Sequence, residues 1–153
     1  MKLLDANILL YAYDTSSSHH ETCRAWLESA FNADEMIALP WQTVLAFVRI
    51  STNPRAVKKP LSSAKACAIV DTWLERPNVI VVNAADRFWN ILRQQILDAQ
   101  VSGPLVTDAA LAALAIEQGA TLCSTDRDFR RFQGLKLVDP LQPIRDSETP
   151  LSR

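Results

Sequence analysis

The stretch "LVTDAALAALAIEQGATLCSTDRDF", from Leu105 to Phe129, decides the fold class that the sequence predicts. It begins as a helix that Gly119 ends, and it continues as a short apolar strand over residues 121–125. Two carboxylates, Asp126 and Asp128, follow this strand at once. Ligands of parallel α/β sheets bind beyond the carboxyl ends of the strands, so the stretch predicts a functional site together with a fold.

The rest of the chain repeats this alternation of helices and strands. Compact apolar runs predict further strands at residues 2–4, 36–39, 79–82 and 135–138. The segment "ANILLYAYD" fits either a helix or another strand, because its periodicity does not distinguish them. Longer amphipathic segments between the strands predict helices. The pattern predicts an α/β domain in which helices cover both faces of a mainly parallel sheet.

Local signals predict where several helices begin. Ser18 and Glu21 match an S-x-x-E capping box, and the hydroxyls of Ser62 and Thr107 are expected to cap two later helices. Pro40 can open a helix, because its missing N–H needs no partner in the first turn.

Length and composition limit the class of protein. The 153 residues, of which 48% are hydrophobic, suffice for one domain, which we expect over residues 1–141 with a polar, disordered tail over 142–153. A formal net charge of −1 means that contact with nucleic acid would need local basic patches. We expect a cytoplasmic protein, because the apolar runs are too short for a membrane span and we read no signal peptide. Its three cysteines form no C-x-x-C pair, so we expect reduced thiols.

Carboxylates follow two of the predicted strands. Asp5 comes directly after the first strand, as Asp126 does after its own, so the two converge if these strands are parallel neighbours. Asp108, in the first turn of its helix, and Asp128 can reach the same space. Taken singly, Asp126 could merely cap a short helix and Asp108 could merely favour a helix N-terminus.

Clustered carboxylates predict a cation. Like charges at close range raise one another's pKa unless a cation compensates them. The sequence has no histidine or cysteine cluster nearby, so the ligands are oxygens, which select Mg²⁺ or Mn²⁺. A metal held by a few carboxylates suits the hydrolysis of phosphate esters.

The segments "LLDANILLYA" and "LVTDAALAALAIEQGATLCSTDRDFRRF", at their separation, resemble PIN-domain ribonucleases. More narrowly, they resemble the VapC toxins of bacterial VapBC toxin–antitoxin systems, over roughly residues 1–141. The resemblance implies a PIN-like three-layer α/β/α sandwich and a Mg²⁺- or Mn²⁺-dependent endoribonuclease. It also implies an RNA substrate such as tRNA, a VapB-type antitoxin and a homodimer as partners.

The resemblance assigns roles to individual residues. It makes Asp5, Asp108 and Asp126 metal-binding carboxylates, with Asp128 as a fourth acidic residue of the catalytic site. The supporting polar groups that it implies are Asn7, Ser124 and Thr125.

One position departs from the family pattern. The family has a glutamate in the second helix, within a pattern like L-E-F-L-R, whereas this chain has "VLAFVRI" and places Ala46 there. No acidic residue occurs between Met36 and Val70, so the fourth carboxylate is absent or is replaced by Asp128 or by a residue distant in sequence. We therefore expect an altered number of metal ions or a weaker metal affinity.

Basic residues near these motifs are candidates for contact with RNA. An acidic pocket repels a polyanion, so phosphates need a basic rim. Arg49, Arg127 and Arg130 are the candidates, and an ordinary solvated surface is the alternative.

Two other functions fit parts of the pattern. A receiver-like phospho-acceptor domain also binds Mg²⁺ in an acidic pocket, but it needs a lysine after a later strand, and none lies between Lys65 and Lys136. A PIN fold that binds RNA or protein without cleavage is the other, and Ala46 favours it. Apolar residues on the helices after Pro40 and Ser62 predict a second copy and an antitoxin segment as partners. They are Trp41, Leu45, Val48, Cys67, Ile69, Val70 and Trp73.

Overall fold

A computed structural model describes residues 1–142, and the predicted disordered tail lies outside them from residue 143 onward. One five-stranded sheet forms its centre, with the strands in the order β3-β2-β1-β4-β5 and every neighbouring pair parallel. The strands are β1 (Lys2–Leu4), β2 (Ile37–Pro40), β3 (Val79–Val82), β4 (Thr121–Cys123) and β5 (Lys136–Val138). The α/β class with a mainly parallel sheet is thereby confirmed.

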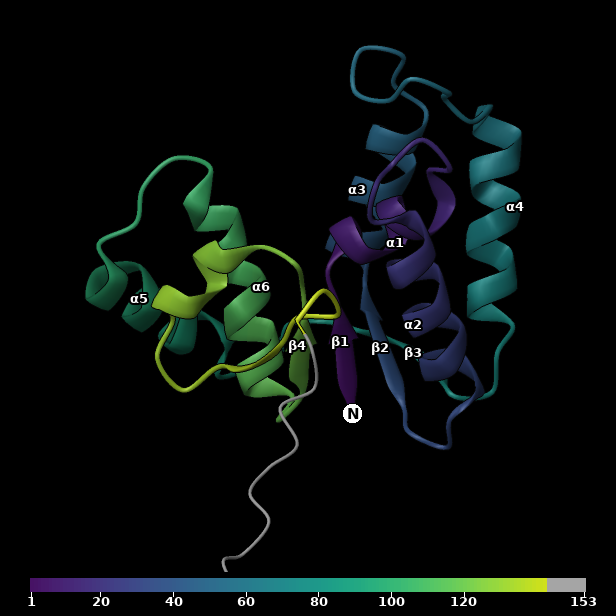
Figure 1. The fold of residues 1–153 in the computed structure, drawn as a ribbon. Coiled ribbons are helices and arrows are strands. Elements are labelled where there is room, and N and C mark those ends of the chain that lie inside the picture. The colour runs from purple at the N-terminus through teal and green to yellow at the C-terminus, as the bar shows by residue number, and fades with distance from the viewer. Residues whose placement is uncertain (143–153) are drawn as a thin grey trace, which may run out of the picture.

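Helices lie on both faces of this sheet (Figure 1). The first face is covered by α1 (Ala6–Tyr13), α2 (His20–Asn32), α3 (Trp41–Ser51) and α4 (Ser63–Leu74), and the second by α5 (Phe88–Ala99) and α6 (Leu105–Glu117). Within β1, Leu4 packs into the first core and Leu3 into the second. Because successive strand residues point to opposite faces, three residues suffice to join both cores into the predicted three-layer sandwich.

The "ANILLYAYD" segment is a helix. Its first N–H groups need acceptors, and the Asp5 carboxylate accepts the Ala6 N–H at 2.7 Å. The cap of α2 differs from the expectation, since His19 stands at its N-cap without a side-chain hydrogen bond. The chain turns just before this helix, where the Ser17 hydroxyl accepts the His19 N–H at 3.1 Å, so the predicted capping box was wrong. Ser62 does cap α4, through the Lys65 N–H.

Helix α6 holds the centre of the second core. Four of its alanines are fully buried, and they allow its backbone to approach the sheet closely: Ala109, Ala112, Ala113 and Ala115. It starts earlier than predicted, because Gly103 turns the chain with φ +60° and Pro104 precedes the first helical residue. Thr107 is therefore a first-turn residue and not the cap, whereas Gly119, with φ +63°, ends the helix as predicted. Within residues 1–142, none of the helices combines the length and the apolar character that a membrane crossing requires.

Candidate metal centre

Strands β1 and β4 are parallel neighbours, with Leu4 beside Cys123 in the register. The Asp5 N–H donates to the Cys123 carbonyl at 3.0 Å, so Asp5 leaves the sheet next to Ser124. This is the condition under which the sequence predicted convergence of the carboxylates. It brings together residues that are more than a hundred positions apart in the chain.

The Ser124 hydroxyl connects the polar groups at this edge. It donates to Asp5 Oδ2 at 2.7 Å, and it accepts from the Asp126 N–H at 3.0 Å and from Asn7 Nδ2 at 3.1 Å. One donor and two acceptor sites are all that a hydroxyl offers, so Ser124 is saturated. The side chain of Asn7 also accepts the Thr125 N–H at 3.4 Å. The structure thus gathers Asn7, Ser124 and Thr125 around Asp5.

Three other carboxylates form a compact cluster. Oxygen atoms of Asp108, Asp126 and Asp128 lie within 4.8 Å of one another. Asp126 also caps the short 3₁₀ helix η1 (Arg127–Arg131) by accepting the Asp128 N–H at 2.8 Å, so both predicted roles of this residue are compatible. The half-exposed Asp128 side chain forms an ion pair with Arg131 at 2.9 Å. Asp5 lies beside this cluster with both of its oxygens already hydrogen-bonded.

A hollow of about 470 Å³ opens over this edge, between α1, α3 and α6. Its acidic wall contains Asp5, Asp108 and Asp126, and α3 contributes Gln42, Ala46 and Arg49. Ala46 therefore faces the carboxylates, as the family pattern implied, but it brings no charge. Leu10, Leu45 and Ile50 also line the hollow.

Two polar residues of α3 that the sequence analysis missed fix this helix at the site. The buried Thr43 hydroxyl donates to the Leu4 carbonyl at 2.7 Å, and Gln42 Nε2 donates to the Thr107 carbonyl at 3.0 Å. Gln42, Ala46 and Arg49 recur at the spacing of one helical turn, which is the signal that would have found this face.

Burial and mutual repulsion raise two of the carboxyl pKa values. Burial raises the pKa of Asp108 to about 6, and the charges of Asp126, Asp5 and Asp128 add to the effect. The pKa of Asp5 is raised by burial, against the hydrogen bonds from Ser124 and the Ala6 N–H. Carboxylates that repel one another in this way are stabilised by a cation. The donors are all hard oxygens, so this donor set fits a hard divalent metal ion.

The profile of the PIN domain family matches residues 2–135. The chain is 39% identical over 140 residues to ribonuclease VapC37 of Mycobacterium tuberculosis, covering 92% of this chain and 97% of that protein. The chain belongs to the VapC family of PIN-domain ribonucleases. It is also 37% identical over 142 residues to ribonuclease VapC33 of the same species, covering 93% of this chain and 99% of that protein.

Solved structures agree with this VapC-family fold. VapBC2 from Rickettsia felis, bound to a DNA fragment from its promoter, aligns with a TM-score of 0.68 at 18% identity, covering 90% of this chain and 97% of that chain. VapBC-1 from nontypeable Haemophilus influenzae gives 0.68 at 15% identity, covering 92% and 98%. At these identities the likeness extends to the fold, and it places the acidic hollow within a PIN architecture.

Acidification is expected to weaken metal binding by this VapC-family chain. A metal ion competes with the proton on Asp108, so Mn²⁺ affinity should fall about tenfold between pH 7.5 and pH 5, given the pKa of about 6. Without metal the sign is opposite, because the raised pKa makes the folded state bind the proton more tightly. This contribution to stability is full below the usual pKa of 3.8 and is lost as the pH rises through 6.

Calorimetry with Mn²⁺ and thermal unfolding in EDTA, each across this pH range, measure the two effects. Asp108→Asn is the matched control, because it removes the titrating group at nearly unchanged volume. An Mn²⁺ affinity that is independent of pH in the unmodified chain would contradict the assignment.

Proposed function

We propose that this VapC-family chain is the toxin of a toxin–antitoxin system, and that it hydrolyses RNA with Mg²⁺ or Mn²⁺ in the hollow beside Asp108. The observation that carries the proposal is the cluster of three carboxylates at the carboxyl edge of the sheet. Family membership supplies the reaction class, since the matched relatives are ribonucleases. A receiver-like domain is not supported by any of these matches.

The chain's residues have separable roles in this proposal. Asp5, Asp108 and Asp126 hold the cation, as the resemblance implies, and the clustered oxygens add Asp128 to this set. Ser124 and the Ala6 N–H fix the Asp5 carboxylate. When bound, the cation supplies the charge that activates water and neutralises the phosphate. Attack of water in line at phosphorus breaks the bond to the 3′ oxygen and leaves a 5′-phosphate and a 3′-hydroxyl. RNA is the expected substrate, with tRNA as the resemblance implies, and the cytoplasm is the expected site of action.

The α3 side of the hollow supports a single metal ion. Two-metal sites need carboxylates on both sides of the reacting phosphate, and α3 offers Gln42, Ala46 and Arg49 there. We expect calorimetry to give one Mn²⁺ per chain. Ala46→Glu should raise Mn²⁺ affinity about tenfold or add a second binding event, because it adds a carboxylate that faces the others. An Mn²⁺ binding isotherm that is unchanged in this variant would show that the side chain at position 46 does not contact the metal ion.

Cleavage of labelled RNA tests the proposed function itself. Incubation with Mg²⁺ or Mn²⁺ should yield products that carry 5′-phosphates, and EDTA should abolish them. Retention of RNA without any cleavage would favour the alternative of a PIN fold that only binds. Expression of the chain alone should arrest growth. If growth is normal, expression of the Ala46→Glu variant tests whether the missing glutamate has disabled the enzyme.

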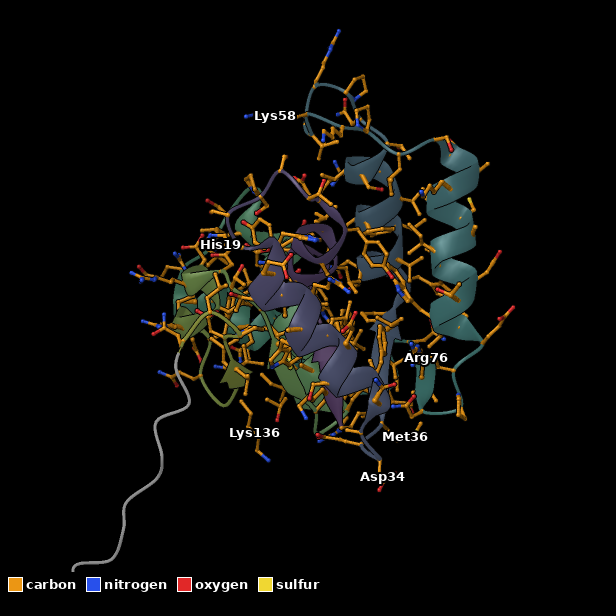
Figure 2. All side chains as sticks on the ribbon, turned by 45° about the vertical axis from the view of Figure 1, so that its right-hand side comes forward. His19, Asp34, Met36, Lys58, Arg76 and Lys136 are labelled. Atoms are coloured by element: carbon orange, nitrogen blue, oxygen red, sulfur yellow. The ribbon has the colours of Figure 1, made fainter. Side chains whose placement is uncertain are left out.

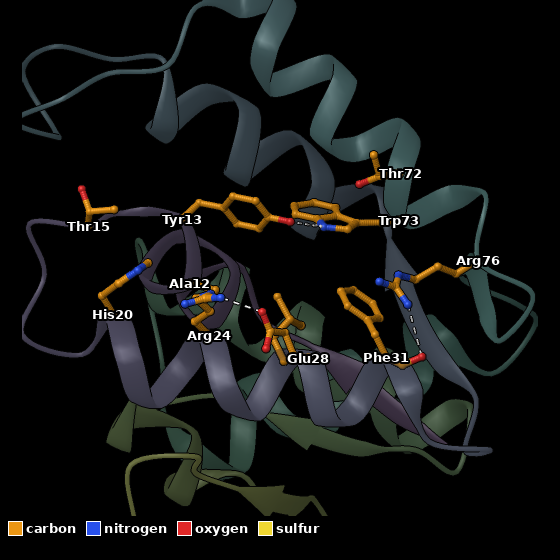
Figure 3. A pocket seen from close by; sticks show the side chains of 11 residues that line it. Ala12, Tyr13, Thr15, His20, Arg24, Glu28, Phe31, Thr72, Trp73 and Arg76 are labelled. Atoms are coloured by element: carbon orange, nitrogen blue, oxygen red, sulfur yellow. Dashed lines mark hydrogen bonds and ion pairs between the residues drawn. The ribbon is translucent and has the colours of Figure 1, made fainter.

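The antitoxin is proposed to dock in a hollow of about 520 Å³ between α2 and α4 (Figure 3). Its floor is apolar, with Leu27 and Phe31 on α2 and the buried Trp73 on α4, whose Nε1–H donates to the Tyr13 hydroxyl at 3.1 Å. Arg76 stacks over Phe31 at 4.6 Å at one end. Arg24 and Glu28 also line this hollow, and an apolar floor with charged residues in its lining suits an amphipathic segment. This shifts the expected docking face from the α3–α4 pair to α2 and α4.

The second partner that we propose is another copy of the same chain, which forms a homodimer with it. Val70 and Trp73 fill the core, so the apolar surface on α4 is smaller than the sequence predicted. On α3, however, Trp41 is 48% and Leu45 is 66% exposed, next to the metal centre. Light scattering at micromolar concentration should report about twice the chain mass of 17.0 kDa. Leu45→Asp should shift the distribution toward the monomer, and a clean monomer of the unmodified chain would contradict this part of the proposal.

A further inference from the structure

Beside the hollow that opens over Asp5 and Asp108, a second hollow at the metal centre shares Asp126 with it. It measures about 200 Å³, and Asp126 and six other residues line it: Ser124, Arg127, Arg130, Leu137, Asp139 and Gln142. Asp126 also lines the hollow over Asp5 and Asp108, so one carboxylate separates the two spaces. Its position is fixed, because its N–H is bound to Ser124 and its carboxylate accepts the Asp128 N–H.

The arginines of this second hollow are not used by the fold. Of the three on η1, Arg131 is paired with Asp128, whereas Arg127 and Arg130 form no ion pair or side-chain hydrogen bond with any of residues 1–142. Both are exposed. A planar guanidinium binds phosphate oxygens through two parallel N–H groups and also stacks on bases. Both guanidinium groups line a space that shares Asp126 with the carboxylate cluster. They therefore favour an anion that is bound next to this cluster.

The hollow is also lined by a carboxylate and an apolar side chain. Asp139 accepts the Leu141 N–H at 2.9 Å through Oδ1, so its carboxylate is oriented, and Leu137 adds an apolar wall. A carboxylate repels phosphate but accepts N–H groups from the edge of a base. The lining thus offers groups for both parts of a nucleotide, with phosphate favoured at the arginines and a base edge favoured at Asp139. Its volume of about 200 Å³ lies below the roughly 300–1,000 Å³ of pockets that enclose drug-sized ligands, so it can enclose part of one nucleotide.

We propose that this second hollow is a subsite for the nucleotide adjoining the phosphodiester bond that is cleaved. The inference rests on the proposed ribonuclease function, because the reacting phosphate is placed at Asp108 and Asp126. A single strand that crosses Asp126 has one nucleotide over α3 and the next over η1. Arg127 and Arg130 hold the phosphate of the latter, and Asp139 reads its base.

RNA binding without cleavage tests the subsite. In EDTA, fluorescence anisotropy of a single-stranded RNA that the unmodified chain cleaves in Mn²⁺ gives the affinity across a salt series. The double variant Arg127→Gln/Arg130→Gln should bind this RNA about tenfold more weakly or worse, since each arginine makes charge-assisted hydrogen bonds. Its log–log salt slope should be shallower by about 0.7 for each phosphate that the variant no longer neutralises. Arg127→Lys/Arg130→Lys should recover part of the affinity, because it keeps the charge without the planar fork.

Controls separate the subsite from the metal centre. Arg93→Gln changes an exposed arginine on α5 that lines neither hollow, and it should leave the affinity and the slope unchanged. Calorimetry should give the same Mn²⁺ affinity for all arginine variants. Asp139→Asn should change which base is preferred beside the cleaved bond, as read by sequencing the products from a random RNA pool.

Several results would overturn the inference. The subsite is refuted if the glutamine double variant binds RNA with the same affinity and the same salt slope as the unmodified chain. The proposed ribonuclease function is unaffected by this result. The subsite is also refuted if the glutamine double variant and Arg93→Gln lose the same amount of RNA affinity, because equal losses indicate unspecific electrostatic attraction. If the unmodified chain neither binds nor cleaves any RNA while still binding Mn²⁺, the ribonuclease function fails and the subsite fails with it.

Discussion

Asp126→Asn is expected to lower the rate of RNA cleavage at least about a hundredfold while leaving the chain folded, because it removes charge from the metal centre and little else. The Asn side chain keeps an oxygen that can accept the Asp128 N–H, so η1 retains its cap. Mn²⁺ affinity should fall with the loss of one of the three clustered carboxylates. Initial rates on labelled RNA, Mn²⁺ calorimetry and thermal unfolding measure the three expectations.

Asp126→Ala separates the two roles of this residue. It removes the cap as well as the charge, so it should cost about 1 kcal/mol of stability beyond Asp126→Asn, with the same loss of cleavage. Both variants should relieve growth arrest when the chain is expressed alone. Cleavage by Asp126→Asn at the rate of the unmodified chain would mean that Asp126 only caps η1, which the sequence left open as its alternative role.

Ser124→Ala is expected to destabilise the fold by about 1–3 kcal/mol and to weaken the metal centre. The buried hydroxyl serves Asp5, Asn7 and the Asp126 N–H, and a methyl group leaves all of them without this partner. Because the Ser124 hydrogen bond lowers the pKa of Asp5, its loss should raise that pKa further and favour the protonated carboxyl. Higher Mn²⁺ concentrations should then be needed for equal occupancy.

A second buried serine provides the matched control. Ser51 is 6% exposed, and its hydroxyl has no hydrogen-bond partner among the described residues, so Ser51→Ala should be neutral or slightly stabilising. The difference between the two variants should be larger at pH 7.5 than at pH 4, since the Ser124 bond stabilises the charged form of Asp5. Denaturant unfolding at both pH values measures it, and equal effects of the two substitutions would refute the role of Ser124.

The convergence of the carboxylates could be predicted from the sequence because it depends on simple regularities. A carboxylate that follows a strand closely lies at the carboxyl edge of the sheet. Asp5 follows β1 directly, whereas Asp126 follows β4 after Ser124 and Thr125, because β4 ends at Cys123 and not at the predicted residue 125. Parallel pairing of β1 and β4 then brings Asp5 to Ser124. The helix stop at Gly119 is equally local, because a residue with positive φ after a helix is most often glycine.

Features that depend on tertiary contacts could not be predicted in this way. The apolar pattern of α4 does not show that Trp73 packs against Phe47 and Tyr13, with ring centroids 4.7 and 5.7 Å away. The sequence therefore predicted that its side chain was available for a partner, yet it is 1% exposed. The bond from Gln42 to the Thr107 carbonyl joins residues 65 positions apart, which no local spacing encodes.

Basic side chains illustrate the same limit. The segment between α3 and α4 carries Lys58, which Figure 2 shows at the loop, projecting from the body of the molecule. In the sequence Lys58 lies in one short basic stretch with Arg49, Arg55 and Lys59, but of these four residues Arg49 alone lines the hollow over the carboxylates. Charge alone did not separate an exposed lysine on a loop from an arginine within reach of the metal centre.

The hydrogen bond between Ser124 and Asp5 joins residues 119 positions apart. A ribosome adds about 5–20 residues per second, so roughly 6–24 s pass between the synthesis of these two residues. During that interval the growing chain contains β1 without β4, and it has no complete set of carboxylates to hold a metal ion. A cell that makes this enzyme therefore encounters ribonuclease activity only after nearly the whole domain has been translated and has folded. A message broken anywhere before the codon for Asp126 yields a product without that activity.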